Sequence, residues 1–222
     1  YWTRKQAEQV LGRIDSVLQL LPRAKKQAHE RIIGGRTVQN EDKILSLYES
    51  QIHVMVRKKA GAEVEFGNNL LIVEQEDGMI VDWCLHEDSV PADCKQLAES
   101  MARMENIFGS NLIKAACTDR GFESSENIKL LSEKGIFNAI CPKNPRHLRE
   151  RMKEEKFAML QKRRGQTEAR IGIFKNVFLG RSLRVRGFGH RDTAVAWNIL
   201  AHNLWVLARL EKVDEVKNKK AA

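Results

Sequence analysis

Two acidic residues lie where carboxylates could take part in chemistry, and Asp119 is the first. It follows the apolar run at residues 112–117 and precedes Gly121, which permits a tight exit toward the next helical pattern. Ligands of open α/β sheets gather just beyond the carboxyl ends of the strands. Asp119 is therefore a candidate metal ligand or catalytic acid, although an Asp here also suits a turn or a helix cap.

Glu168 is the second. Arg164 lies four residues before it and Lys175 seven residues after it, so a helix would place all three on one face. Such a face could be an ordinary salt-bridged surface or a surface that contacts phosphates. Other cations of this stretch add to the second interpretation: Lys162, Arg163 and Arg170.

The charge of the chain is unevenly distributed. The net charge of the 222 residues is +9, but residues 60–135 carry 15 acidic against 6 basic side chains, a balance of −9. Residues 142–191 carry 15 basic against 4 acidic side chains, a balance of +11. This partition suits an enzyme that holds metal with one part and phosphate with another, or a helix with a solvated basic face.

Other features narrow the class of protein. No apolar run approaches the roughly 20 residues that span a bilayer, which disfavours a membrane protein. The four cysteines form no CxxC pair and are typical of reduced, small apolar residues. The chain begins at Tyr1 without an initiator Met and continues directly into a helical pattern, so we expect a fragment that lacks its N-terminal region.

Hydrophobic periodicity predicts the elements that position these residues. The first half should contain a helix over about 3–30 broken at Pro22, strands over 43–48 and 52–56, a polar linker over 57–61, and a hairpin of strands 70–73 and 79–85 joined at Asp77-Gly78. The second half should contain helix 93–107, strand 112–117, helix 124–134, strand 136–141, helices 146–178 with a break near Gly165 and 192–211, and a frayed charged tail. This order indicates an α/β fold with a mixed sheet.

Several motifs together resemble the DDE transposases of bacterial insertion sequences. The spacing of Arg164, Glu168 and Lys175 is similar to the family signature Tyr-x2-Arg-x3-Glu-x6-Lys, with Gln161 at the Tyr position. The stretch 118–122 (TDRGF) resembles the family's D-x-G-[YF] block. Further similar stretches are 62–68 (AEVEFGN), 78–83 (GMIVDW) and the pairs 197–198 and 202–203, so the resemblance covers about residues 43–210.

The resemblance implies a ribonuclease-H-like fold, a mixed five-stranded sheet flanked by helices. It implies an N-terminal helical segment over 1–40, a catalytic domain over 41–211 and a charged tail over 212–222. The family's first carboxylate follows a Ser-x-x context, which Ser46 and Glu49 match with Glu in place of the usual Asp. Asp82 is the rival first carboxylate, Asp93 is a supporting acid, and an acid in the missing N-terminal part is the remaining alternative.

The implied activity is that of a DNA transposase with Glu49, Asp119 and Glu168 as catalytic residues and as ligands of two Mg²⁺ or Mn²⁺ ions. Arg164, Lys175, Arg163 and Arg170 would bind double-stranded DNA. The resemblance also implies a homodimer on paired transposon ends and a cytoplasmic location at the bacterial nucleoid. Two alternatives stay open: an inactive, transposase-derived DNA-binding remnant, and another metal nuclease on the same scaffold.

Overall fold

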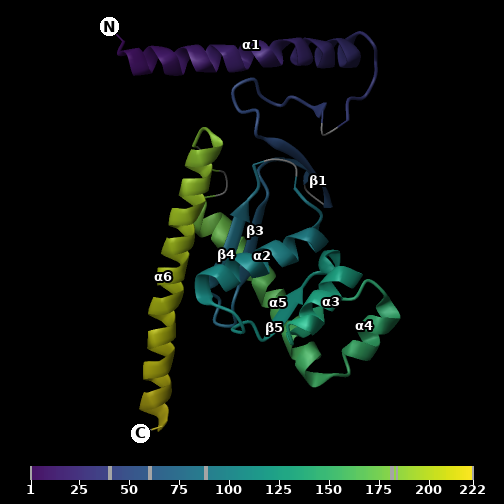
Figure 1. The fold of residues 1–222 in the computed structure, drawn as a ribbon. Coiled ribbons are helices and arrows are strands. Elements are labelled where there is room, and N and C mark those ends of the chain that lie inside the picture. Colours follow the sequence, from purple (N-terminus) through teal and green to yellow (C-terminus); the bar gives the residue numbers. More distant parts are fainter. Residues whose placement is uncertain are drawn as a thin grey trace. The chain divides into compact units, whose positions relative to one another are not determined.

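The computed structural model describes residues 2–39, 42–59, 62–87, 90–180, 183 and 185–221 of the chain (Figure 1). The chain divides into two compact units. Unit 1 comprises Tyr1–Asn69, Leu85–Ser89 and Val185–Arg191, and unit 2 comprises Leu70–Cys84, Val90–Arg184 and Asp192–Ala222.

Unit 1 begins with the long helix α1 (Arg4–Ile32). A capping box starts it: the Thr3 hydroxyl accepts a hydrogen bond from the Gln6 amide, and the Gln6 side chain accepts one from the Thr3 amide. Pro22 lies inside the helix, so the predicted break there is wrong. A proline removes one backbone hydrogen bond, and the remaining turns of this helix continue past it.

The predicted strand over residues 43–48 is also wrong, because side chains take the backbone groups that a strand would pair. The side chain of Gln27 makes two hydrogen bonds with the backbone of Ile44. Its Nε2 donates to the Ile44 carbonyl, and its Oε1 accepts from the Ile44 N–H. The Ser46 hydroxyl then accepts hydrogen bonds from the amides of Tyr48 and Glu49, both at 3.1 Å. Such local bonds favour a turn over an extended strand.

The expected strand over residues 52–56 is confirmed as β1 (His53–Lys59), which pairs antiparallel with β2 (Ala62–Gly67). Val54 lies opposite Phe66 in this register. Residues 57–59 of the predicted linker therefore belong to a strand, and residues 60 and 61 lie outside the described residues.

The first element of unit 2 is the expected hairpin of β3 (Leu70–Glu74) and β4 (Ile80–Leu85). The Asp77 carboxylate accepts a hydrogen bond from the Met79 amide at 2.9 Å, and Gly78 has a positive φ of +96°. This backbone conformation favours glycine, as the Asp-Gly signal predicted.

The core of unit 2 joins two helices to a parallel strand pair. Helix α2 (Asp93–Phe108) is followed by β5 (Ala115–Thr118), the short 3₁₀ helix η2 (Arg120–Phe122), α3 (Ser125–Glu133) and β6 (Phe137–Ile140). β5 and β6 are parallel, with Thr118 opposite Ile140. Their buried apolar side chains form one cluster: Leu97, Met101, Ala116, Leu131, Ile136 and Ile140.

Helices make up the remainder: α4 (Pro145–Arg151), α5 (Glu155–Ile173), the π-helical turn η3 (Phe174–Phe178) and α6 (Phe188–Ala221). The helical region is interrupted at residues 152–154 rather than near Gly165, which lies within α5. The backbone of residues 212–221 continues α6, whereas we expected a frayed tail.

Aromatic packing joins η3, which follows α5, to α6 within unit 2. The ring centroid of His202 lies 5.7 Å from that of Phe174 and 5.2 Å from that of Phe178. The neighbouring Asn203 pairs with the backbone of β4: its amide donates to the Ile80 carbonyl at 2.8 Å, and its oxygen accepts from the Ile80 amide at 2.9 Å. These contacts fix α6 against both η3 and the hairpin.

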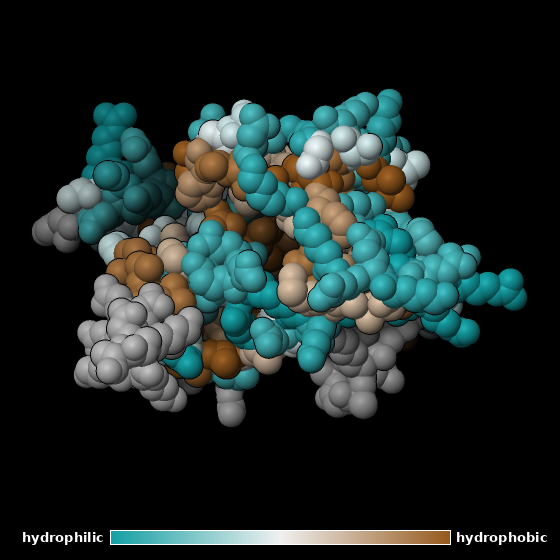
Figure 2. All heavy atoms as spheres, turned by 90° about the horizontal axis from the view of Figure 1, so that it is seen from below, coloured by the Kyte–Doolittle hydropathy of each residue, from teal (hydrophilic) through white to brown (hydrophobic). Residues whose placement is uncertain are grey.

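The chain is a mixed α/β protein, as the element order predicted. Its described strands form three two-stranded sheets, β1–β2, β3–β4 and β5–β6, and do not form the single five-stranded sheet that we expected. Hydrophilic side chains cover much of the face in Figure 2, with hydrophobic atoms visible between them. Within the described ranges, no helix combines the length and the apolar character needed to cross a membrane.

Candidate active site

Asp119 follows β5 directly and starts the turn that leads into η2. Its Oδ1 accepts a hydrogen bond from the Arg120 amide at 3.1 Å, so the residue caps this short helix. Gly121 is required for packing, because a β-carbon at this position would overlap the Asp93 carboxylate. The side chain of Asp119 is 61% exposed and is therefore open to solvent at the end of the strand.

Glu168 projects from α5, the helix that packs against β5 and β6. Arg164, one turn earlier, connects it to Asp119. The Nη1 atom of Arg164 lies 3.1 Å from Asp119 Oδ1 and 3.1 Å from Glu168 Oε1. Two acids with 48 residues between them in the sequence thus converge on one guanidinium group.

Gln161 positions this guanidinium. Its side-chain oxygen accepts a hydrogen bond from Arg164 Nε at 3.3 Å, and its Nε2 donates to the Ala139 carbonyl of β6 at 2.7 Å. Nε2 also lies 3.7 Å from the sulfur of Cys117, whose pKa is raised to about 11 by burial. The departure from the signature Tyr therefore has a structural role, which connects α5 to the strand pair.

Each of the two acids keeps one carboxylate oxygen that could coordinate a cation. Asp119 Oδ2 and Glu168 Oε2 have no hydrogen-bond or ion-pair partner in the described part of the chain. Carboxylate oxygens are the ligands that Mg²⁺ and Mn²⁺ prefer. Among the described residues, however, no group of three or more His, Cys, Asp or Glu side chains gathers closely enough to hold a metal ion.

Glu49, the predicted first carboxylate, belongs to unit 1 and is held there by two partners. The Gly187 amide lies 3.0 and 3.1 Å from its two oxygens, and Arg191 Nη1 donates to Oε2 at 2.6 Å. Burial opposes its ionisation, but the hydrogen bonds from Arg191 and Gly187 and the charges of Arg191 and Arg186 lower its pKa below the ordinary 4.5. Its role as a metal ligand stays a prediction.

The surroundings of Glu49 are open on one side. A cavity of about 380 Å³ lies beside it, lined by Ser46, Tyr48, Glu49 and Arg186. Arg191 is buried, and its Nε and Nη2 atoms have no hydrogen-bond partner among the residues that the structure describes. The sequence pattern did not reveal the pairing of Arg191 with Glu49. Glu49 and Arg191 are 142 positions apart in the chain, and a single sequence contains no information about a contact between residues so far apart.

Asp82, the rival first carboxylate, is a buried member of an ion pair. It is 6% exposed and accepts hydrogen bonds from the Ser100 hydroxyl at 2.6 Å and from Arg103 at 2.7 and 2.9 Å. The hydrogen bond to Asp82 raises the pKa of Arg103 above its ordinary value. These contacts connect β4 to α2 and leave Asp82 a structural role.

Arg163 and Arg170, two of the predicted DNA-binding residues, contact the β3–β4 hairpin. Arg170 Nη1 lies 3.2 Å from Glu74 Oε1, and Arg163 donates to the carbonyls of Gln75, at 2.9 Å, and Glu76. Thr167 donates to the same Glu74 oxygen at 2.6 Å. The sequence pattern did not reveal Glu74 or Thr167 as partners of these arginines.

Lys175 differs from those arginines. It lies in the π-helical turn η3, and its side chain is exposed with no partner in the ranges that the structure covers. Its amine remains available for a phosphate. A π turn inside a helical region is frequent at functional sites.

Comparison with known proteins identifies the class of protein that carries this site. Residues 56–204 match the family model of the transposase DDE domain, which is more than half of the chain. The chain therefore belongs to this family. Neither the curated proteins nor the solved structures that were compared include a match.

Proposed function

We propose that this chain is the catalytic part of a bacterial insertion-sequence transposase that cleaves and joins DNA strands by two-metal phosphodiester transfer. Family membership supports DNA as the substrate. The observation that carries the proposal is the convergence of Asp119 and Glu168 on Arg164, at the end of β5 and on α5. An arrangement of two acids and a cation suits a site that handles both metal and phosphate.

In this proposal Asp119 and Glu168 hold divalent cations, Mg²⁺ or Mn²⁺, through their unpaired oxygens, and Glu49 supplies the third carboxylate. Two such ions would activate the attacking oxygen and stabilise the departing one. Arg164 and Lys175 contact the phosphates beside the bond that is cut. Arg163 and Arg170 stay candidate DNA contacts, with guanidinium groups that also stabilise α5 against the hairpin.

The finer features of the proposal rest on family membership. They are the ribonuclease-H-like arrangement of the strands, the assignment of residues 1–40, 41–211 and 212–222 to a helical segment, a catalytic domain and a tail, and the action of a homodimer on paired transposon ends. The place of action would be the DNA of a bacterial nucleoid.

The experiment compares Asp119→Asn, Glu168→Gln and Glu49→Gln with a matched control, Glu126→Gln. Glu126 is exposed on α3, and none of its contacts in the described part involves the site. We expect the first two variants to reduce cleavage and strand transfer into plasmid DNA, with Mg²⁺ or Mn²⁺ present, by at least about 10³-fold, since each removes a metal ligand. The control should retain full activity.

Retained activity in Asp119→Asn or Glu168→Gln would contradict the two-metal assignment. If Glu49→Gln alone retained activity, another acidic residue would have to be the first carboxylate. Nicking of RNA–DNA hybrids or four-way junctions without strand transfer would favour another nuclease of the same scaffold.

A second candidate, an inactive DNA-binding remnant, is favoured by one observation: both oxygens of Glu49 already have partners, Gly187 and Arg191. This candidate predicts DNA binding without cleavage that Asp119→Asn does not change. The transposase predicts metal-dependent cleavage, so one assay separates the two functions.

A further inference from the structure

A row of cations on and after α4 is available to a ligand. The helix begins at Pro145, and Asn144 caps it by accepting a hydrogen bond from the Arg146 amide at 2.9 Å. Arg146 and Arg149 are three residues apart, and Lys153 follows four residues later in the turn after the helix. The offset of three places Arg146 and Arg149 on one face of α4, and these two with Lys153 are here called the basic stripe.

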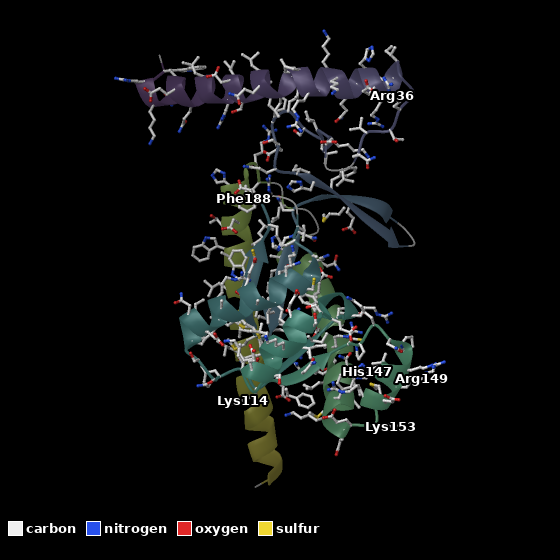
Figure 3. The ribbon with its side chains drawn as sticks, turned by 45° about the vertical axis from the view of Figure 1, so that its right-hand side comes forward. Arg36, Lys114, His147, Arg149, Lys153 and Phe188 are labelled. Carbon is white, nitrogen blue, oxygen red and sulfur yellow. The ribbon has the colours of Figure 1, made fainter. Side chains whose placement is uncertain are left out.

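The cations of the basic stripe are exposed and have no hydrogen bond or ion pair with any residue that the structure describes. Glu150, four residues after Arg146 and beside the stripe, makes no ion pair with it in the described ranges. Figure 3 shows Arg149 and Lys153 with His147 at the corner of unit 2 that α4 forms.

Arg151, on the same helix, shows what an arginine with a structural role does here. Its Nη2 donates to the Asn138 carbonyl at 2.7 Å, its Nε lies 3.3 Å from a Glu154 oxygen, and its guanidinium stacks 4.5 Å from the centre of the Phe157 ring. The basic stripe makes none of these packing contacts. No contact within the described part of the chain therefore explains why the three cations of the basic stripe are arranged in this way.

α4 starts near the edge of the strand pair at which Asp119 lies and then runs back along β6, since Arg151 at its end contacts Asn138 and the Phe137 ring. β5 and β6 are parallel, so their carboxyl ends lie at one edge, where Asp119 follows β5 and the loop to α4 follows β6. Contacts of Lys143 join the two connections. Its amide donates to a Glu123 carboxylate oxygen at 2.6 Å, and its Nζ donates to the Glu123 carbonyl at 2.7 Å.

We infer that the basic stripe binds the phosphate backbone of double-stranded DNA that extends beyond the strand held at Asp119 and Glu168. This inference rests on the proposed function, and it assigns DNA contacts that the motifs on α5 did not indicate. Unpaired, solvent-exposed cations suit a polyanion, because binding releases condensed counterions without breaking any bond within the protein. Backbone contacts of this kind set the register of the DNA without reading its sequence.

The test measures the affinity for a short mixed-sequence DNA duplex by fluorescence anisotropy across about 50–200 mM salt. The variant Arg146→Gln/Arg149→Gln is compared with Lys114→Gln/Lys129→Gln, which removes the same charge from other exposed positions of unit 2. Lys114 precedes β5 at its amino end, and Lys129 lies on α3. All variants are assayed without divalent metal, so cleavage plays no part.

For Arg146→Gln/Arg149→Gln we expect the affinity to fall by about tenfold to a hundredfold and the salt slope to decrease by about 1.8, since each phosphate contact contributes about 0.9. Arg146→Lys/Arg149→Lys should restore both values, which also excludes misfolding as the cause. Equal losses in the two Gln variants would overturn the inference. So would an unchanged salt slope. The result is independent of whether Asp119→Asn abolishes cleavage, which tests the proposed function.

Discussion

Arg164 contacts both acids through one nitrogen, so each carboxylate keeps one oxygen free. Exposed ion pairs of this type contribute only about 0–1 kcal/mol each, because water screens them. A guanidinium held so weakly can leave the acids when a phosphate arrives. The geometry predicts that Arg164 competes with a metal ion for Asp119 and Glu168 while DNA is absent.

Arg164→Gln should therefore strengthen Mn²⁺ binding to the DNA-free protein by several-fold, to about tenfold, because it removes a cation beside two carboxylates. Calorimetric or electron paramagnetic resonance titration measures this affinity, with Lys129→Gln as the control. Glu168→Gln should weaken the same binding, which identifies the site. Unchanged or weaker Mn²⁺ binding in Arg164→Gln would contradict the competition.

Glu49 gives a prediction about acid stability. Burial raises its folded-state pKa, but the hydrogen bonds from Arg191 and Gly187 together with the charges of Arg191 and Arg186 outweigh burial, so the pKa is lowered. A lowered pKa means that the ionised side chain stabilises the fold above the ordinary value of 4.5, and that this contribution is lost as the pH falls through the folded pKa. Glu49→Gln should cost about 1–3 kcal/mol near neutral pH.

Urea unfolding of wild type and Glu49→Gln across the acidic pH range tests whether the stabilisation by Glu49 is lost at low pH. The difference between their free energies of unfolding should shrink as the pH falls below 4.5. A difference that stays constant with pH would show that the carboxylate charge of Glu49 does not stabilise unit 1.

At the scale of elements, two glycines near the site have opposite roles. Gly121 lies against Asp93, so Gly121→Ala should force the η2 turn to shift, at a cost of about 1–3 kcal/mol. Gly165 has open space around it in the interior of α5, so Gly165→Ala should stabilise the protein by about 0.5–1 kcal/mol. Thermal and urea unfolding of both variants measures these changes. A neutral Gly121→Ala would contradict the packing argument.

The elements that the sequence predicted well are those with a local signal. The Asp-Gly hairpin, α2, α3 and the strands on both sides of α3 follow from turn residues and apolar periodicity, which act over a few residues. The errors at residues 43–48 and at Pro22 have other causes. Gln27 and Ser46 capture the backbone of the first segment, and a long helix continues through a proline.

At the scale of the whole molecule, the sequence predicted the transposase family and the acidic pair but not the partners of the charges. The spacing of Arg164 and Glu168 within one helix is visible in a single sequence. Asp119 lies on another element, so only the resemblance to the transposase motifs indicated that it belongs to the same site. The pairs Glu49–Arg191 and Glu74–Arg170 join residues far apart in the chain. Such contacts depend on the fold, so composition and periodicity cannot give them.

These long-range ion pairs divide the cations of the basic region into two groups. The basic region at residues 142–191 contains arginines that neutralise internal acids, such as Arg170 and Arg191. It also contains cations with no partner in the described part of the chain, such as Lys175 and the basic stripe. Only the second group is free to contribute to DNA binding without a loss of stability. The net charge alone does not distinguish the two groups.

Asn203 has a consequence for how copies of this protein behave toward one another. Its side-chain amide occupies both the N–H and the C=O of Ile80, two of the β4 edge groups through which a foreign strand could extend the hairpin. Unpaired strand edges act as templates for aggregation, and natural proteins protect them with covering groups. A helix that contributes one amide at this point thereby makes the β4 edge a poor starting place for edge-to-edge assembly.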